Sequence, residues 1–403
     1  MSRHRWVILG VCLLGFMQVH IHRVGFAPLI PTFMGDLGIT YAAAATIMTA
    51  YFWTYTAAQV PVGVLADRLG PRRMMLTFLS LLVVGAIAFP LSRGYAQSLV
   101  ARGLIGLGAA GIWLPGLRLI HEWFPPQERG RATGLFSAGG GIGGTTALVL
   151  VPALAEHFGW RWGYAMTLLP LLTTLALIYL LVRPGPLAER RLPAADSRST
   201  TTVLKDVLGV AAVWPINVAV FFSFGAFIAL VTFLPAFLVR QEGLTPGRAG
   251  LVTGLITAGT VVSWPLAGFI SDWIGRRKVI YVFSQGMCVL SCLAFALLVP
   301  GTGWAGAALV ALLTGLMLGG LVTPFVMVVE LFPSHLIGTA SGVVNTFCFA
   351  GSLLIPVLIG KILDVSGSFP AAFTVCAVFE ALALASAAFT RETGMHRRPV
   401  MVT

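Results

Sequence analysis

Four side chains able to bind an anion or carry a proton stand inside long apolar segments of this 403-residue sequence: His20, Arg23, Arg102 and Arg118. A guanidinium forms two parallel hydrogen bonds with a carboxylate or phosphate. An imidazole changes its charge near physiological pH. Because burying a charge among apolar groups is costly, ionisable residues in such segments are candidates for function. These residue types in this setting predict recognition of a small anion.

On a regular helix, His20 and Arg23 share a face with Phe16 and Ala27, because residues three and four apart are neighbours. His22 lies about 200° from His20 at about 100° per residue, so no metal site is predicted in this pair. Arg118 stands one turn before Glu122. It can reach the membrane surface beside Glu122 or serve as a ligand, and both alternatives stay open. Arg102 faces about 160° away from Arg118 and is a candidate for structure or coupling.

The composition predicts a membrane protein. Hydrophobic types make up 57% of the residues and charged types only 10%, against about 25% charged in ordinary globular domains. This excludes a soluble enzyme and a disulfide-stapled secreted domain. The five cysteines stand in apolar runs, as small core residues do. The net charge of +12 lies in loops between apolar stretches, so it reports membrane topology and predicts no nucleic-acid partner.

Walking the chain for segments of about 20 apolar residues predicts twelve membrane-spanning helices. The first apolar run has no small-residue cleavage site after it and is predicted to be retained. A polar, proline-containing stretch divides the spans into bundles at 1–182 and 207–403, with a cytoplasmic linker at 183–206. The expected spans are 6–33, 43–66, 73–92, 97–121, 130–153, 160–182, 208–237, 246–270, 279–299, 303–329, 337–360 and 368–390.

Lys and Arg are distributed unequally between the two sides of these spans. With the N-terminus in the cytoplasm, 18 of them fall on the cytoplasmic side and 5 on the other. Cytoplasmic loops of membrane proteins carry such an excess. The pattern predicts a multi-pass protein of the cell (inner) membrane, embedded in its lipid bilayer, with both termini in the cytoplasm.

An internal repeat relates the two halves. The segment from Gly63 to Arg73, GVLADRLGPRR, follows the second span, and GFISDWIGRRK, from Gly268, follows the eighth. The motif EWFP at Glu122 likewise returns as ELFP at Glu330. These pairs are separated by 205 and 208 residues, which predicts two parallel six-helix halves. Trp273 departs from the first copy, where Arg68 stands.

These loops, together with RGLIGLG from Arg102, resemble the signature motifs of the major facilitator superfamily. The resemblance covers the whole chain. It implies an all-α membrane fold in which two six-helix bundles surround a central cavity and alternate between inward-open and outward-open states.

Charged residues of the repeated loops form a predicted latch on the cytoplasmic side. Asp67 or Asp272 can meet a helix N-terminus or an arginine, and the loop arginines can reach Glu122 and Glu330. Contacts that differ between two states bias the equilibrium between them. The alternative is that these charges only anchor the loops at the headgroups. The predicted latch residues are Gly63, Asp67, Arg68, Gly70, Arg73, Glu122, Gly268, Asp272, Gly275, Arg277 and Glu330.

Two glycine patterns, Gly106-x-Gly108-x-x-Gly111 and Gly139-x-Gly141-x-x-Gly144, match a dinucleotide fingerprint but lie within apolar helices. We interpret Gly130/Gly134, Gly139/Gly143 and Gly140/Gly144 as close-packing pairs of the fifth span. No phosphate-binding GxxxxGK[ST] occurs in the sequence, so no nucleotide-driven pumping and no cofactor are predicted.

The resemblance implies that spans 1, 4, 7 and 10 line the cavity. Acidic residues are nearly absent from these spans, and Glu380 lies in the last span, which is usually peripheral. A cavity rich in cations suits an anion. Polar and aromatic residues of neighbouring spans supply walls with a few polar groups. The predicted substrate-binding residues are Arg23, His20, Arg118, Tyr51, Tyr55, Gln59, Asn217, Phe221 and Asn345, and the coupling candidates are His20 and Arg102.

The sequence therefore predicts a secondary transporter of a small organic anion, such as a carboxylate, acting as a monomer. Coupling to protons through His20, exchange and facilitated diffusion all stay open. Nitrate is disfavoured because nitrate porters of the superfamily place arginines in spans 2 and 8, and apart from the loop residue Arg68 and Arg248, which is counted on the outer side, this chain has none there. The alternatives are a multidrug or metabolite efflux proton antiporter and, from another class, a non-transporting membrane sensor of the same fold.

Overall fold

The computed structural model describes residues 4–183, 185, 200–333 and 336–393. Within these ranges it describes every side chain except those of residues 60, 61, 63, 64, 66–68, 121, 126, 127, 129, 130, 200–203 and 338. The latch candidates Gly63, Asp67 and Arg68 lie outside the described side chains. The described residues are arranged in helices and their connections, without a strand among them.

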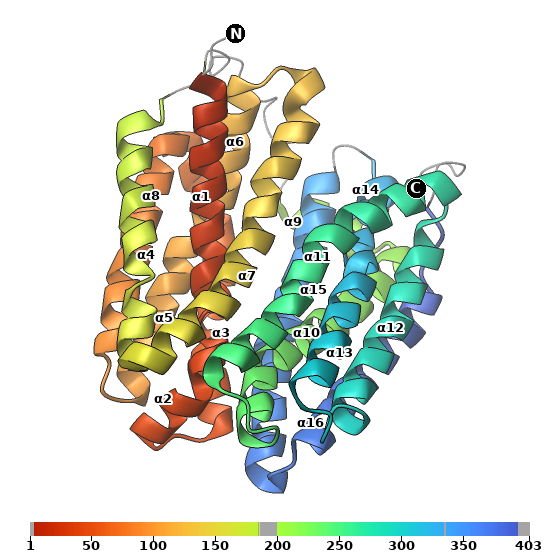
Figure 1. Ribbon diagram of the computed structural model, residues 1–403. Helices are drawn as coiled ribbons and strands as arrows, with labels where there is room; N and C mark the ends of the chain where they lie inside the picture. Colours follow the sequence, from red (N-terminus) through yellow and green to blue (C-terminus); the bar gives the residue numbers. More distant parts are fainter. Residues whose placement is uncertain (1–3, 184, 186–199, 334–335, 394–403) are drawn as a thin grey trace. The chain divides into compact units, whose positions relative to one another are not determined.

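The helices follow one another along the chain, mostly with short connections; the longest separation is the one between α8 and α9 (Figure 1). Their bounds are α1 (His4–Val24), η1 (Ala27–Leu29), α2 (Ile30–Leu37), α3 (Tyr41–Leu69), α4 (Pro71–Leu91), α5 (Tyr95–Ala110), α6 (Trp113–Trp123), α7 (Pro126–Ala165), α8 (Leu168–Leu181), α9 (Thr200–Leu208), η2 (Ala211–Val213), α10 (Trp214–Arg240), α11 (Pro246–Ile274), α12 (Arg277–Leu297), α13 (Gly303–Met317), η3 (Leu318–Val322), α14 (Thr323–Leu331), α15 (Ile337–Ser366) and α16 (Phe369–Ala388).

Ten helical stretches in the described part of the chain are long and apolar enough to cross a membrane. One of them, Arg131–Leu181, has 51 residues and bends at Gly159, whose φ of 79° lies outside the helical region. Its two arms correspond to the fifth and sixth predicted spans. With α3, which has 29 residues, the helices account for all twelve predicted spans.

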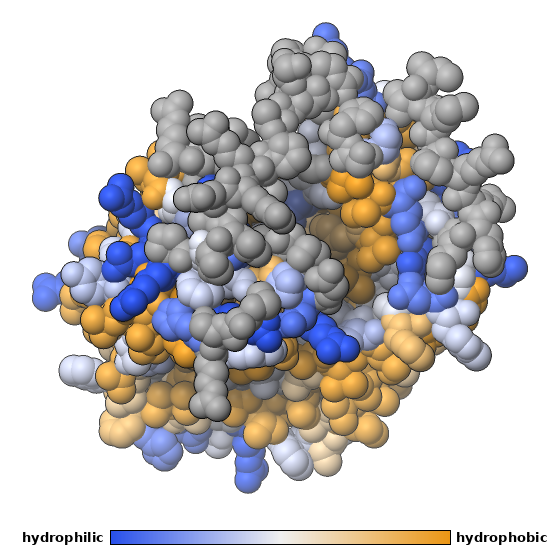
Figure 2. All heavy atoms as spheres, turned by 90° about the horizontal axis from the view of Figure 1, so that it is seen from above, coloured by the Kyte–Doolittle hydropathy of each residue, from blue (hydrophilic) through white to orange (hydrophobic). Residues whose placement is uncertain are grey.

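The chain divides into two compact units. Unit 1 contains Met1–Leu192 and Thr232–Gly254, and unit 2 contains Pro193–Val231 and Leu255–Thr403. Each unit presents long apolar side chains outward, including Leu169 and Phe158 in unit 1 and Phe269 and Leu297 in unit 2. Figure 2, which looks onto one end of the helices, shows blue hydrophilic residues on that end and orange apolar residues around its margin. This distribution fits a lipid-facing flank with polar ends.

In unit 1, the extensive contact of α1 with α7 depends on glycine (Figure 1). A Cβ atom on Gly139 would stand 2.6 Å from the Leu13 carbonyl oxygen, and one on Gly143 would stand 2.3 Å from the Met17 carbonyl oxygen. The predicted close packing of the pair Gly139/Gly143 is therefore confirmed. Gly106 of α5 approaches α3 in the same way, with the Tyr51 carbonyl oxygen 2.1 Å from an added Cβ. The predicted packing at Gly134 is wrong, because an added Cβ there meets no atom within 4 Å.

In unit 2, α12 packs extensively against α16. A second core joins α9, α10, α12, α14 and α15 through buried aliphatic side chains around Tyr281 and Met327. Gly351 of α15 meets the backbone of α10, where an added Cβ would lie 1.8 Å from the Phe221 carbonyl oxygen. Small residues thus allow backbone approach in this unit too.

Gly143→Ala is expected to destabilise unit 1, because the new methyl group would enter the space of a backbone oxygen that cannot rotate away. Overpacking of this kind costs about 1–3 kcal/mol. Thermal unfolding of the purified protein in detergent measures the effect. The matched control is Gly134→Ala on the same helix, where an added Cβ meets no atom within 4 Å. An equal melting temperature for the two variants would contradict the packing argument.

Candidate functional site

The first predicted span is interrupted near its middle, and the sequence explains the interruption. Pro28 has no N–H to donate to the Val24 carbonyl, so the regular helix cannot continue past this point. Accordingly α1 ends at Val24, and the chain passes through a short 3₁₀ turn into α2. The expectation of one regular helix through Ala27 was wrong for this reason.

Arg102 of α5 binds the end of α1. Its side chain is fully buried, and its guanidinium donates to the carbonyl oxygens of His22 at 2.5 Å and Arg23 at 3.1 Å. A third, longer contact reaches the Met48 carbonyl oxygen of α3 at 3.4 Å. A cation is favourable at a helix C-terminus, where carbonyl groups lack partners. Arg102 thereby fixes the backbone that carries Arg23.

Arg23 lies against an aromatic surface of α3. Its guanidinium carbon is 5.5, 5.8 and 5.3 Å from the ring centroids of Tyr51, Phe52 and Tyr55. These are cation–π distances. The ring centroids of Tyr51 and Tyr55 are 5.8 Å apart and the rings are stacked, because residues four positions apart lie on the same face of a helix. The structure therefore brings Arg23, Tyr51 and Tyr55 together.

His20 orients Arg23 through a hydrogen bond that fixes the tautomer of the imidazole. An arginine can only donate, so the Arg23 Nη1 at 3.4 Å donates to His20 Nε2. The opposite ring nitrogen, Nδ1, then donates to the Phe16 carbonyl oxygen at 3.2 Å. This arrangement requires a neutral imidazole. Gly140 of α7 leaves the space for the ring, because an added Cβ would lie 2.9 Å from His20 Cε1.

The predicted face of α1 is confirmed where α1 is helical. Phe16 and His20 are in ring contact at 4.5 Å, one turn before Arg23. His22 points elsewhere, as expected, and its Nδ1 lies 3.2 Å from the Tyr164 hydroxyl. The described residues contain no group of three or more His, Cys, Asp and Glu placed to hold a metal ion.

The remaining predicted substrate residues are dispersed. Arg118 forms an ion pair with Glu122 at 3.3 Å, as expected from the alternative in which its side chain extends toward the membrane surface beside Glu122. Gln59 is half-buried on α3, and its side-chain nitrogen is a buried atom without a hydrogen-bond partner. In unit 2, Asn217 is fully buried with both amide atoms unpaired, while Phe221 and Asn345 are half-buried. Their roles in binding stay predictions.

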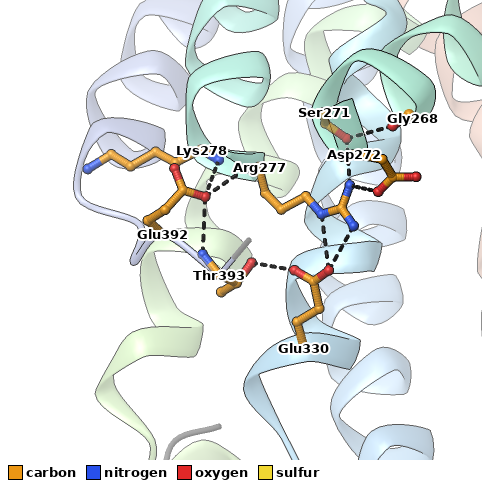
Figure 3. Close-up of polar contacts among 8 residues, drawn as sticks. All are labelled: Gly268, Ser271, Asp272, Arg277, Lys278, Glu330, Glu392 and Thr393. Atoms are coloured by element: carbon orange, nitrogen blue, oxygen red, sulfur yellow. Dashed lines mark hydrogen bonds and ion pairs between the residues drawn. The ribbon is translucent and has the colours of Figure 1, made fainter. Parts of the chain in front are cut away.

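A second polar cluster lies at one end of unit 2 and contains predicted latch residues (Figure 3). The Arg277 guanidinium donates to Glu330 Oε1 at 3.0 and 2.9 Å and to Ser271 Oγ at 2.7 Å, and it also pairs with Asp272. The backbone is shaped for this contact by Gly275, whose φ is 69°. Gly70, the equivalent glycine of the first repeat, has φ 73°.

The segment after α16 completes this cluster (Figure 3). The Glu392 carboxylate accepts from the backbone N–H groups of Arg277 at 2.6 Å and Lys278 at 3.1 Å. A carboxylate is favourable at a helix N-terminus, so Glu392 caps α12. Thr393 donates from its hydroxyl to Glu330 Oε2 at 2.8 Å. Both oxygens of Glu330 are therefore engaged, one by α12 and one by the C-terminal segment.

In the first half of the repeat, Glu122 stands where Glu330 stands in the second half, but it has different partners. Glu122 receives the side chain of Arg118 and the backbone N–H of Gly185 at 3.2 Å. The two latch acids are 208 residues apart, and so are the residues Gly185 and Thr393 that bind them. Arg73, predicted as the latch cation of this half, is exposed. Its neighbour Arg72, which aligns with Arg277, donates to the Tyr179 carbonyl oxygen at 2.5 Å.

Several contacts were not predicted from the sequence. Phe52 is next to Tyr51 in the sequence but is not on the helix face shared by Tyr51 and Tyr55, and Tyr164 belongs to no motif. For Gly140 the sequence predicts helix packing but not its contact with the His20 ring. Glu392 and Thr393 follow the last span without a pattern of their own; only the 208-residue offset from Gly185 connects them to the repeat.

The sequence matches the family described as the Major Facilitator Superfamily over residues 9–356 and again over residues 240–401. The chain belongs to the major facilitator superfamily. It is a multi-pass membrane transporter and not an enzyme, and the predicted resemblance and fold class are confirmed.

Members of the superfamily that transport anions are among its relatives. The "Probable nitrate/nitrite transporter NarK2" of Mycobacterium tuberculosis is 27% identical over 84% of each chain. The D-galactonate transporter of Escherichia coli is 22% identical over 94% of this chain and 93% of its own. A solved bacterial homologue of the human lysosomal transporter Spinster, inward-facing and occupied, superimposes with a TM-score of 0.81 at 16% identity over 97% of this chain and 98% of its own. That likeness shows the fold.

Arg277→Ala is expected to lower the melting temperature of the purified transporter, because Asp272 and Glu330 lose their shared cation. Losing hydrogen bonds to a charged group costs about 2–3 kcal/mol. The matched control is Arg276→Ala, which removes the same charge from an adjacent, exposed side chain. Thermal unfolding in detergent compares the two. If Arg276→Ala were as destabilising as Arg277→Ala, loss of net charge rather than of this cluster would be the cause.

Proposed function

We propose that this superfamily member is a secondary transporter that moves a small organic anion, a carboxylate, by alternating access, with Arg23 as the principal anion-binding group. The single observation that carries the proposal is the setting of Arg23. Arg102 donates to the backbone carbonyl oxygen of Arg23. His20 accepts a hydrogen bond from the Arg23 guanidinium, and the aromatic surface of α3 lies beside that guanidinium. A pre-positioned guanidinium binds a carboxylate with little loss of conformational freedom.

Tyr51 supplies a second polar group to the same site. Its side chain is fully buried, and its hydroxyl interacts with Arg23 through a side-chain hydrogen bond and with Arg102 electrostatically. The Tyr51 hydroxyl is thereby held beside the guanidinium, and its O–H can donate to an oxygen of a bound anion. Arg23 and Tyr51 can therefore contact one carboxylate together, while the surrounding rings exclude water.

The names of the relatives support an anion as cargo. D-Galactonate is a carboxylate, and the relative that transports it matches almost the full length of this chain. Nitrate and nitrite form the second candidate class, supported by the NarK2 relative. Spans 2 and 8, where nitrate porters are expected to carry arginines, contain here only Arg248 in the first turn of span 8, besides Arg68 in the loop after span 2, so we favour the carboxylate.

The latch and the topology belong to the same proposal. We place the protein in the cell (inner) membrane with both termini on the cytoplasmic side, following the distribution of Lys and Arg. The cluster around Arg277 would then stabilise one state of the transporter and break in the other. Asp67 holds the equivalent place in the first half. The transporter acts as a monomer and takes up protons with its cargo. The further role of His20 as the proton carrier would require breaking its bond to Arg23.

Arg23→Gln and Arg23→Lys are both expected to reduce anion uptake about tenfold or more, because neither side chain offers the planar pair of donors. The assay is uptake of radiolabelled D-galactonate and, separately, nitrate into proteoliposomes. Ligand-induced thermal stabilisation over a panel of anions and cations gives an independent readout.

Arg131→Gln serves as the matched control, because it removes one arginine from an exposed position of α7. It should transport as the unmodified protein does. Uptake of both anions by Arg23→Gln at the control rate would refute the anion site. Efflux of cationic dyes by the unmodified protein, without anion uptake, would instead favour the multidrug exporter.

A further inference from the structure

Glu380 is a buried acid that the proposed anion site does not use. It lies in the middle of α16, 11 residues from the first residue of that helix and 8 from the last, which is about 12–16 Å from either end at 1.5 Å per residue. Only 2% of its surface is exposed. An acid at this depth of a membrane protein is expensive, and a function is the default hypothesis for it.

The groups facing Glu380 are polar and uncharged. Its carboxyl interacts with the Ser223 hydroxyl of α10. The titratable groups that the described residues bring near it are Tyr281, Cys288 and Cys292 of α12 and Cys376 of its own helix. From α15, which also packs on α16, Cys348 faces Tyr281. No Lys, Arg or His is among these neighbours in the described part of unit 2.

Two hydrogen-bonding arrangements are available to this cluster. Ser223 Oγ donates to Gln285 Oε1 at 3.1 Å, so its lone pairs are available to accept a proton-bearing carboxyl group. This is the arrangement of a protonated Glu380. The Tyr281 hydroxyl interacts with Gln285 through a side-chain hydrogen bond, and Glu380 Oε2 has no hydrogen-bond partner.

The second arrangement suits an ionised carboxylate. The Ser223 hydroxyl can rotate toward Glu380, and the Gln285 amide and Tyr281 hydroxyl, which interact with each other through a side-chain hydrogen bond, both carry N–H or O–H donors. All four side chains are at least 98% buried. A buried carboxyl oxygen without a partner costs free energy. The donors of α12 can stabilise the charged state when the unit rearranges.

We infer that Glu380, with Ser223, Gln285 and Tyr281, forms a proton-binding site of unit 2 that couples proton movement to transport. The step is the exchange of one proton: the carboxylic acid releases H⁺ to water in one state of the transporter, and the carboxylate takes H⁺ from water in the other. The inference rests on the proposed transport function only for the coupling. The binding of the proton is a property of the cluster itself.

The first experiment detects the proton without any substrate. Infrared difference spectra of the purified, lipid-reconstituted full chain are recorded between acidic and alkaline pH. The unmodified protein should show a carboxylic-acid band that disappears as the pH rises. Glu380→Gln should lack this band, whereas the control Asp364→Asn, which alters an exposed acid of α15, should keep it. A Glu380 band that persists at every pH at which the protein is folded would overturn the inference.

Ser223→Ala provides a second variant should Glu380→Gln fail to fold. It keeps the acid and removes the hydroxyl beside it, so the same band should shift in frequency and still titrate. An unshifted band would show that Ser223 is not its partner and would overturn the proposed arrangement.

The second experiment measures coupling in proteoliposomes that contain a trapped pH-sensitive dye. Addition of D-galactonate or nitrate should move protons with the anion in the unmodified protein. In Glu380→Gln, proton movement should fall to the rate of empty liposomes, and in the control Asp364→Asn, an exposed acid outside the site, it should continue. Proton movement kept in Glu380→Gln, or flux that depends on Na⁺ instead of pH, would overturn the inference. Absence of counterflow of either anion by the unmodified protein would refute the proposed function, while the infrared experiment still decides the proton site.

Discussion

The organisation of unit 1 depends on one buried guanidinium. Arg102 has to satisfy its donors inside an apolar bundle, and the last carbonyl groups of α1 lack helical partners because the helix ends at Val24. The two needs meet where Arg102 donates to the carbonyl oxygens of His22 and Arg23. The break in α1 is thus both permitted and fixed, and the side chain of Arg23 leaves the helix at a determined point beside α3.

The close approach of α1 and α7 extends this constraint to the site. Glycines of α7 bring its backbone against α1, so His20 reaches Arg23 from a helix with little freedom to move away. The histidine has its two ring nitrogens assigned by its neighbours, one as donor and one as acceptor. Unit 1 therefore holds its cations with carbonyl groups, aromatic rings and an imidazole. Unit 2 buries Glu380 beside the Ser223 hydroxyl, and its ion pairs around Arg277 lie at the end of the helices, where water lowers the cost of charge.

Much of this could be read from the sequence, and the limits have physical causes. Apolar length predicts the spans, and helical spacing predicts that His20 and Arg23 share a face, because both depend on local periodicity. The repeat predicts that Arg277 can reach Glu330. The break in α1 also has a local signal in Pro28, but the length of the apolar segment concealed it. The partners of Arg102 could not be predicted, since every residue has a backbone carbonyl group. Whether Arg72 or Arg73 points toward the rest of unit 1 depends on the rotation of α4 about its own axis, which the sequence does not specify.

The two latch acids show how a repeat preserves a position while its chemistry changes. Glu122 and Glu330 each bind the residue 63 positions further along the chain, where the polypeptide leaves the last helix of its half. In the first half this residue is Gly185, and its backbone N–H approaches so closely that a Cβ would lie 2.5 Å from Glu122 Cβ. In the second half a hydroxyl of Thr393 spans a larger gap. Each acid thus ties the fourth span of its half to the chain that follows the sixth. Among the described side chains, the loop arginine Arg277 also binds the acid of unit 2, whereas Glu122 of unit 1 pairs with Arg118 of its own helix.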